Sequence, residues 1–189
     1  SEVFQLGLEG MGMAKDAFVK KLKEYRLPTA NQTSGKGKDG KARILVMGNV
    51  VDRPDLFNLI ENGGADVVAA DLCTAMRHFD YLVEEDAEEP YLALARGYLN
   101  RPGCARMTGV EERLADMMKL AKDYAVDGVV YTSVKFCDQH LSDAPYFAEK
   151  LKEAGIPILF LENDYTWSTI GQLKTRVEAF IEMLDAGRR

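Results

Sequence analysis

The sequence predicts an α/β domain of three layers, α/β/α, built on a roughly four-stranded parallel sheet. Two observations support this fold class. Between Arg43 and Leu184, short apolar runs alternate with segments of helical periodicity, and strands that alternate with helices run parallel and are joined by right-handed crossovers. The apolar runs are continuous, which indicates strands buried on both faces of the sheet. The expected architecture is flavodoxin-like or Rossmann-like.

Four segments carry the strand pattern. The first, ILVMG at 44–48, ends at Gly48, and the others are ADVVAAD at 65–71, DGVVYTSV at 127–134 and IPILFLEND at 156–164. Pro54 marks the first turn of the helix after the first strand, because proline is favoured there. Further helical patterns lie in the insertion at 79–100 and at 110–121, 144–154 and 169–184.

The first 42 residues differ from the rest in their sequence pattern. MAKDAFVKKLKEYRL at 13–27 has helical spacing, and PTANQTSGKGKDG at 28–40 is a polar, glycine-rich linker that cannot build a core. We therefore divide the chain into a lead-in helix and flexible linker, 1–42, and an α/β domain, 43–189. The first residue is not Met, so we expect either a processed chain or a piece of a longer protein.

Composition excludes several classes of function. The net charge is −6 with no basic cluster, which argues against nucleic-acid binding and against a membrane-surface role. No apolar run approaches the ~20 residues that span a bilayer, and the first twelve residues do not form a signal peptide. The three cysteines contain no CxxC pair and are too sparse for a disulfide scaffold. A cytoplasmic chain with reduced thiols is expected.

The candidate site lies in the segments that follow the strands, because ligands of open α/β sheets bind beyond the carboxyl ends of the strands. Cys73, Cys137 and both histidines, His78 and His140, fall in these segments. The four segments read GNVVDRP, DLCTAMRHF, KFCDQH and ENDYTWS. This clustering is the main functional signal of the pattern.

Cys137 has two interpretations. It directly follows a buried strand, where most free cysteines are inert apolar residues. Alternatively it is a thiolate, nucleophile or metal ligand, whose pKa Lys135 or His140 lowers. Spacing alone favours the inert thiol.

The other signals are weaker. Cys73 can simply finish a strand, and Cys104 lies in a connecting loop. Convergence of all three thiols on an iron–sulfur cluster is open, but compact ferredoxin spacings are absent. Trp167 either stacks on a planar ligand or packs over the end of the sheet. No dinucleotide fingerprint or P-loop is present.

Several segments together resemble a known family. DLCTAMRHFDYLVEE and YLNRPGCAR resemble the middle of the subunits of 2-hydroxyacyl-CoA dehydratases and benzoyl-CoA reductases, such as the 2-hydroxyglutaryl-CoA dehydratase D-component. DGVVYTSVKFCDQH and GIPILFLENDYTWSTIGQLKTRVEAFIEML resemble the family's carboxy-terminal signature. The resemblance covers 43–184. It implies the carboxy-terminal α/β domain of a larger two-domain subunit, paired with a related second subunit as a heterodimer.

The resemblance also implies a cofactor. The cysteine of the KFCD loop ligates a [4Fe–4S] cluster in the family, so Cys137 is the expected metal and cofactor ligand. Ser133, Lys135, Asp138 and Gln139 flank it and are candidates for tuning it. The family's other ligands lie in the amino-terminal domain. We therefore expect this chain alone to lack the cluster and to be inactive.

The implied chemistry begins with one electron from an ATP-dependent iron–sulfur activator protein. In the dehydratases the reduced cluster passes it to the acyl-CoA substrate, and a ketyl radical anion then permits dehydration, a lyase reaction. In the reductases the same input reduces an aromatic ring. Which reaction, which acyl-CoA and which catalytic side chains apply here is left open by the sequence.

Two alternatives remain beside this family interpretation. One is a flavodoxin-like domain that binds a small ligand without a cluster. The other is a thiol enzyme with Cys137 as nucleophile and His140 as base.

Overall fold

The computed structural model describes residues 2–25, 40–79, 81–100, 103–106 and 109–187. Its sheet has four strands in the order β2-β1-β3-β4, and every pairing is parallel. The strands are β1 (Arg43–Gly48), β2 (Asp66–Asp71), β3 (Gly128–Val134) and β4 (Ile158–Asn163). The predicted four-stranded parallel sheet is therefore confirmed, with strand boundaries within two residues of those expected.

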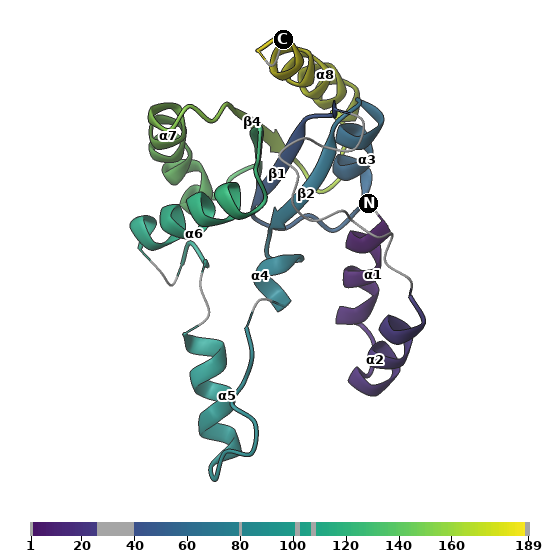
Figure 1. Cartoon of the computed structure of the whole chain (residues 1–189), viewed down its shortest axis with the longest axis vertical. Coiled ribbons are helices and arrows are strands. Elements are labelled where there is room, and N and C mark those ends of the chain that lie inside the picture. The colour runs from purple at the N-terminus through teal and green to yellow at the C-terminus, as the bar shows by residue number, and fades with distance from the viewer. Residues whose placement is uncertain (1, 26–39, 80, 101–102, 107–108, 188–189) are drawn as a thin grey trace.

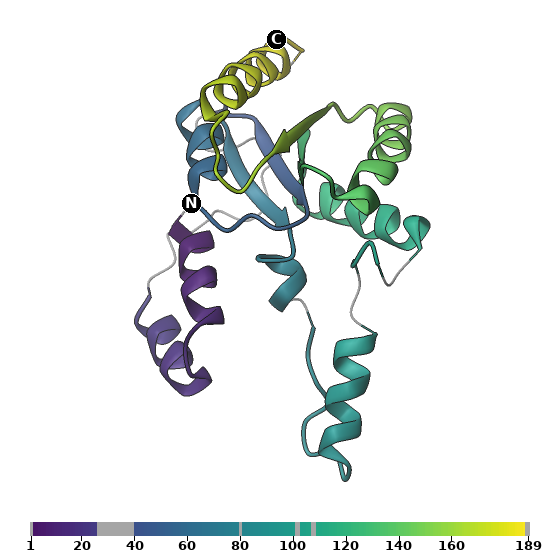
Figure 2. The same ribbon diagram turned by 180° about the vertical axis from the view of Figure 1, so that it is seen from behind.

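The helices cover both faces of the sheet, which confirms the three layers (Figures 1 and 2). They are α1 (Glu2–Met11), α2 (Lys15–Glu24), α3 (Asp55–Asn62), α4 (Met76–Phe79), α5 (Pro90–Leu99), α6 (Val110–Asp123), α7 (Asp138–Glu153) and α8 (Ile170–Gly187). On one face, Ile44 and Val46 pack with side chains of α3 and α8. On the other, Leu45 and Met47 pack with side chains of α6 and α7. Alternate residues of β1 thus enter two separate cores, as a strand buried on both faces requires.

The amino-terminal helices differ from the expectation. The sequence predicted one lead-in helix at 13–27, whereas the structure has α1 as well as α2. Phe4 of α1 stacks on Phe57 of α3 with ring centroids 4.1 Å apart, so α1 contacts the domain that follows. The linker predicted at 28–40 lies almost entirely outside the described residues, and the division of the chain at residue 42 stays a prediction.

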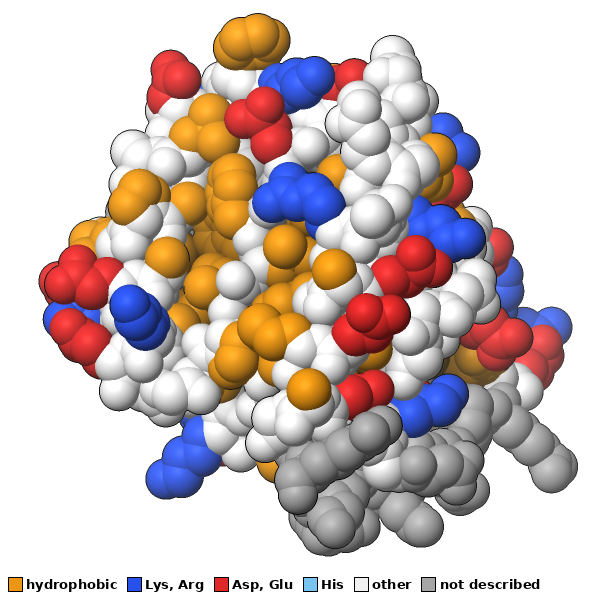
Figure 3. Space-filling view, turned by 90° about the horizontal axis from the view of Figure 1, so that it is seen from above, with side chains coloured by type: hydrophobic (Ala, Val, Ile, Leu, Met, Phe, Trp, Pro, Cys, Tyr) orange, Lys and Arg blue, Asp and Glu red, His pale blue; other side chains and the backbone are white. Residues whose placement is uncertain are grey.

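The two ends of the sheet differ in character. Figure 3 looks onto the end opposite α4 and α5, where hydrophobic side chains gather in a band across the surface. At the amino ends of β3 and β4, Met118, Ala121, Ala154 and Ile156 help to line a hollow of about 550 Å³. The thiols and histidines singled out in the sequence belong to the opposite, carboxyl end. Among the described residues, none of the helices combines the length and the apolar composition that crossing a membrane requires.

Candidate functional site

Gly48 and Asn49 join the carboxyl ends of three strands. Gly48 has φ +138°, and a Cβ there would lie 1.8 Å from the carbonyl oxygen of Thr132 in β3, so only glycine fits. The buried Asn49 donates its backbone N–H to Thr132 O (3.3 Å) and accepts the Cys73 N–H at its own carbonyl (3.3 Å). Its Oδ1 accepts the Val134 N–H at 3.2 Å. The sequence reasoning missed Asn49, although an asparagine directly after a strand-ending glycine was visible.

Cys137 lies at the end of a tight turn that leaves β3. The turn closes through the Cys137 N–H, which donates to Val134 O at 3.1 Å. Phe136, within the turn, has φ +66° and is 91% exposed, a strained conformation for a bulky residue. Cys137 is half-buried and is the N-cap of α7, whose sixteen residues begin at Asp138. A helix amino terminus carries partial positive charge.

The start of α7 corrects the sequence expectation of a loop at 135–140 and a helix from 144. Pro145, which is the second residue of the helix predicted at 144–154, lies inside the observed helix. The first turns are held instead by tertiary packing, because His140, Phe147 and Leu151 are buried along one face. The consequence is that Cys137 belongs to a helix terminus and not to an open loop.

The four residues expected around Cys137 have different environments. Ser133 is fully buried, and its hydroxyl donates to Val134 O at 3.3 Å. Lys135 is exposed and lies 4.0 Å from the carboxylate of Asp164. Asp138 is exposed in the first turn of α7, and the Gln139 carbonyl accepts the Ser142 hydroxyl at 3.0 Å. The backbone thus brings Lys135 and Asp138 to the surface on either side of Cys137, while Ser133 faces the interior.

His140 is bound to Tyr131 of β3. The Tyr131 Oη and His140 Nδ1 atoms are 2.8 Å apart in a buried hydrogen bond. Burial, together with the nearby Arg77 and Arg113, lowers the pKa of His140 to about 4, so the imidazole is neutral near pH 7. Burial also raises the pKa of Tyr131. With its Nδ1 engaged and its basicity reduced, His140 is poorly suited to be the base of a thiol enzyme.

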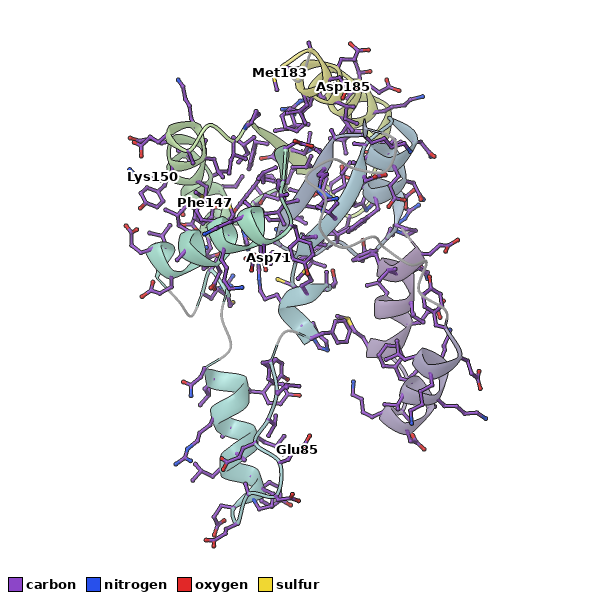
Figure 4. All side chains as sticks on the ribbon, viewed as in Figure 1. Asp71, Glu85, Phe147, Lys150, Met183 and Asp185 are labelled. Carbon is purple, nitrogen blue, oxygen red and sulfur yellow. The ribbon has the colours of Figure 1, made fainter. Side chains whose placement is uncertain are left out.

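Arg77 organises the segment that contains Cys73. Its guanidinium forms two hydrogen bonds with the Asp71 carboxylate, at 3.0 and 2.9 Å, and donates to Gly48 O at 3.2 Å and to the Cys73 sulfur at 3.7 Å. A Cβ on Gly103 would lie 2.9 Å from Arg77 Nε. The loop of Cys104 therefore lies against the same guanidinium. Figure 4 labels Asp71 at this end of the sheet.

The three thiols do not form one metal site within the described part of the chain. Burial raises the pKa of Cys73, and Arg77 contacts both the Cys73 sulfur and the loop of Cys104. Cys137 lies instead in the turn between β3 and α7. No group of three His, Cys, Asp or Glu side chains that could hold a metal ion occurs among the described residues.

The segment after β4 is a capped turn. Asp164 accepts hydrogen bonds from the hydroxyls of Thr166 (2.7 Å) and Ser168 (3.0 Å). These bonds, with Lys135 nearby, lower the pKa of Asp164 to about 2. Trp167 is buried in the core beneath α8, so of its two interpretations the packing one is confirmed.

Comparisons with known proteins find relatives among dehydratase subunits. The (R)-phenyllactyl-CoA dehydratase beta subunit of Clostridium sporogenes is 30% identical over 77% of this chain and 38% of its own length. An Escherichia coli K12 protein that carries the name dehydratase subunit YjiM is 31% identical over 90% of this chain and 45% of its own. The (R)-2-hydroxyglutaryl-CoA dehydratase beta subunit of Acidaminococcus fermentans is 25% identical over 91% and 46%.

The chain thus spans less than half the length of these curated relatives. The family described as 2-hydroxyglutaryl-CoA dehydratase, D-component, matches residues 1–184. That match covers the sheet, the turn at Cys137 and the capped turn after β4. It also includes α1 and α2, which lie outside the range 43–184 of the resemblance seen in the sequence. The chain belongs to the 2-hydroxyglutaryl-CoA dehydratase D-component family.

Proposed function

We propose that this chain is the α/β part of a 2-hydroxyacyl-CoA dehydratase subunit, and that Cys137 supplies one thiolate ligand of a [4Fe–4S] cluster. The family and the curated relatives carry the names of dehydratases, which favours a lyase over an aromatic-ring reductase. Two of those relatives act, by name, on (R)-phenyllactyl-CoA and (R)-2-hydroxyglutaryl-CoA. Both are thioesters of 2-hydroxy acids, so a 2-hydroxyacyl-CoA is the proposed substrate class.

The observation that carries the proposal is the position of Cys137. The thiol is half-buried just beyond the carboxyl end of β3, one of the two inner strands, and Cys137 is the N-cap of a long helix. A thiolate-ligated cluster is anionic, and a helix amino terminus stabilises negative charge. A buried aliphatic position would have contradicted the proposal. Because no other ligand set surrounds Cys137 among the described residues, the remaining ligands must come from outside them.

The chain's own residues hold this thiol and shape its surroundings. When bound, the cluster would supply low-potential electrons for removal of the 2-hydroxyl group. Val134 O accepts the Cys137 N–H, and the Tyr131–His140 hydrogen bond ties the first turn of α7 to β3. Lys135 and Phe136 are exposed beside the thiol, where they can contact a ligand. The partners we propose are a related second subunit and an ATP-dependent iron–sulfur activator protein.

The test compares cysteine variants of the subunit purified without oxygen together with its partner. Cys137→Ser should lower the bound iron and sulfide and abolish oxygen-sensitive dehydration of 2-hydroxyacyl-CoA. Cys104→Ser is the matched control, because Cys104 is also a half-buried cysteine outside any disulfide, and it should retain the iron. Full iron content and activity in Cys137→Ser would overturn the assignment and favour a ligand-binding domain without a cluster.

A second measurement tests whether the chain is sufficient alone. We expect the 189-residue chain, purified anaerobically, to contain no stoichiometric iron or sulfide. A [4Fe–4S] spectrum from this chain alone, lost on substitution of any of its three cysteines, would contradict the single-ligand arrangement.

A further inference from the structure

Residues 81–100 form an arm that extends away from the sheet (Figures 1 and 2). An extended segment runs along the arm, and α5 returns beside it. The two are packed on each other, because the rings of Tyr81 and Tyr98 are 5.2 Å apart and a Cβ on Gly97 would lie 3.0 Å from the Val83 side chain. Ala93 is the buried residue of α5. The other faces of the helix have no element of the described chain beside them in either view.

These free faces are apolar. The helix PYLALARGYL contains one charged residue, Arg96, and six large hydrophobic side chains of the arm are exposed: Leu82, Tyr91, Leu92, Leu94, Tyr98 and Leu99. The exposed fraction reaches 95% for Leu82 and 86% for Tyr91. A ten-residue helix is marginal in water without tertiary packing, and a helix that is apolar on most sides is normally buried. The arm therefore has the composition of an element covered by another protein surface.

The tip of the arm adds a charge to this surface. Glu84, Glu85, Asp86, Glu88 and Glu89 are all exposed, and Figure 4 labels Glu85 far from the sheet. Within the described ranges, no ion pair joins any of these five carboxylates to a lysine or arginine. A fitting partner presents an apolar groove with Lys or Arg at its rim. A second copy of this chain fits less well, since its own net charge is −6.

We propose that the arm docks into such a groove on the second subunit of the dehydratase, with Leu92 and Leu99 as central anchors. This inference rests on the proposed function for the existence of that subunit. Leu92 and Leu99 are seven residues apart and lie on one side of α5. A hollow of about 320 Å³, lined by Tyr81, Leu82 and Gly97 among others, can accept a side chain of the partner. Insertion of an apolar helix with a few dominant anchors is a common mode of recognition.

The test uses the subunit produced with an affinity tag in cells that contain the whole dehydratase. A photo-cross-linking amino acid is placed at position 92 or 99, and the cross-linked peptide is identified by mass spectrometry. The expected product is a peptide of a different chain of the same dehydratase family. A cross-link to a second copy of this chain, to another region of the same subunit or to an unrelated protein would overturn the proposal, as would no cross-link.

Substitutions provide the second readout. The double variant Leu92→Glu/Leu99→Glu should reduce co-purification of the partner about tenfold or more, because loss of a buried anchor costs at least ~1.4 kcal/mol of binding. Met183→Glu is the control, since Met183 is a half-exposed apolar residue of α8, remote from the arm in Figure 4. Unchanged thermal unfolding shows that both variants fold. Equal co-purification of the partner by all three proteins would refute the docking.

The two proposals fail in different ways. If the arm inference is wrong, Cys137→Ser still loses iron while the arm variant keeps its partner. If the cluster assignment is wrong, Cys137→Ser keeps its iron while the arm variant still loses the partner.

Discussion

His140 should make the chain less stable as the pH falls from 7.5 to 5. In the folded chain the pKa of His140 is about 4, against an ordinary value of 6.5, because burial and two nearby arginines disfavour the imidazolium. Protonation therefore favours the unfolded chain, where the pKa is ordinary. The stabilisation is complete above pH 6.5 and is lost as the pH falls toward 4. Each pH unit between the two pKa values corresponds to ~1.4 kcal/mol, so the loss is roughly 2 kcal/mol by pH 5.

The perturbation that isolates this effect is His140→Gln, which removes the titrating group and leaves the others in place. Urea unfolding at pH 7.5, 6.5, 5.5 and 5 gives the free energy of unfolding of both proteins. The stability of the original chain relative to the variant should fall by roughly 2 kcal/mol from the first pH to the last. The chain has two histidines, so the NMR resonance lost in the variant identifies His140. A difference in stability that does not change with pH, or a titration of that resonance near 6.5, would refute the buried neutral imidazole.

Two further predictions concern the carboxyl edge of the sheet. Gly48→Ala should destabilise the chain by about 3 kcal/mol or more in thermal unfolding, because the new Cβ would meet Thr132 O in a backbone conformation that alanine rarely adopts. The control is Gly171→Ala in α8, where the Cβ has open space, and it should be neutral or stabilising by up to about 1 kcal/mol. Equal losses of stability in the two variants would contradict the steric argument. Arg77→Met should lower the free energy of unfolding by about 3 kcal/mol, because it leaves the Asp71 carboxylate without its partner. Adding Asp71→Asn should recover part of that loss in urea unfolding. Additive losses would show that the two side chains are not coupled.

The sequence predicted the fold well because the apolar runs of a parallel sheet are local features. The apolar run at 44–48 is continuous because both faces of the strand are buried. Ile44 belongs to the core on one face of the sheet, and Leu45 belongs to the core on the other. The start of α7 was predicted too late because burial of His140 in its first turn is a tertiary contact that the local pattern does not contain. Local pattern therefore located the strand before Cys137 but not the helix after it.

The partners of the site residues could not be predicted for a similar reason. His140 was a candidate base for Cys137, three residues away, but its hydrogen-bond partner is Tyr131, which is nine residues away on a strand. Arg77 contacts both Gly48 and the loop of Gly103. Gly48 lies well before Arg77 in the sequence, and Gly103 lies well after it. Periodicity indicates which face of a strand or helix a side chain lies on. Which residue it contacts there depends on the order of the strands in the sheet. The order β2-β1-β3 places these segments together.

The thiol of Cys137 is held by a chain of contacts that begins on a different strand. Asn49 accepts the N–H of Val134 at its side chain, and Val134 in turn accepts the N–H of Cys137. The turn that presents the thiol is therefore anchored through residue 134 to the end of β1, and Gly48 is the residue that lets β1 approach β3 so closely. A ligand of a metal cofactor must keep a nearly fixed geometry, and sites on rigid elements achieve this better than free loops. The same contacts explain how the sheet positions the short turn that carries the cysteine.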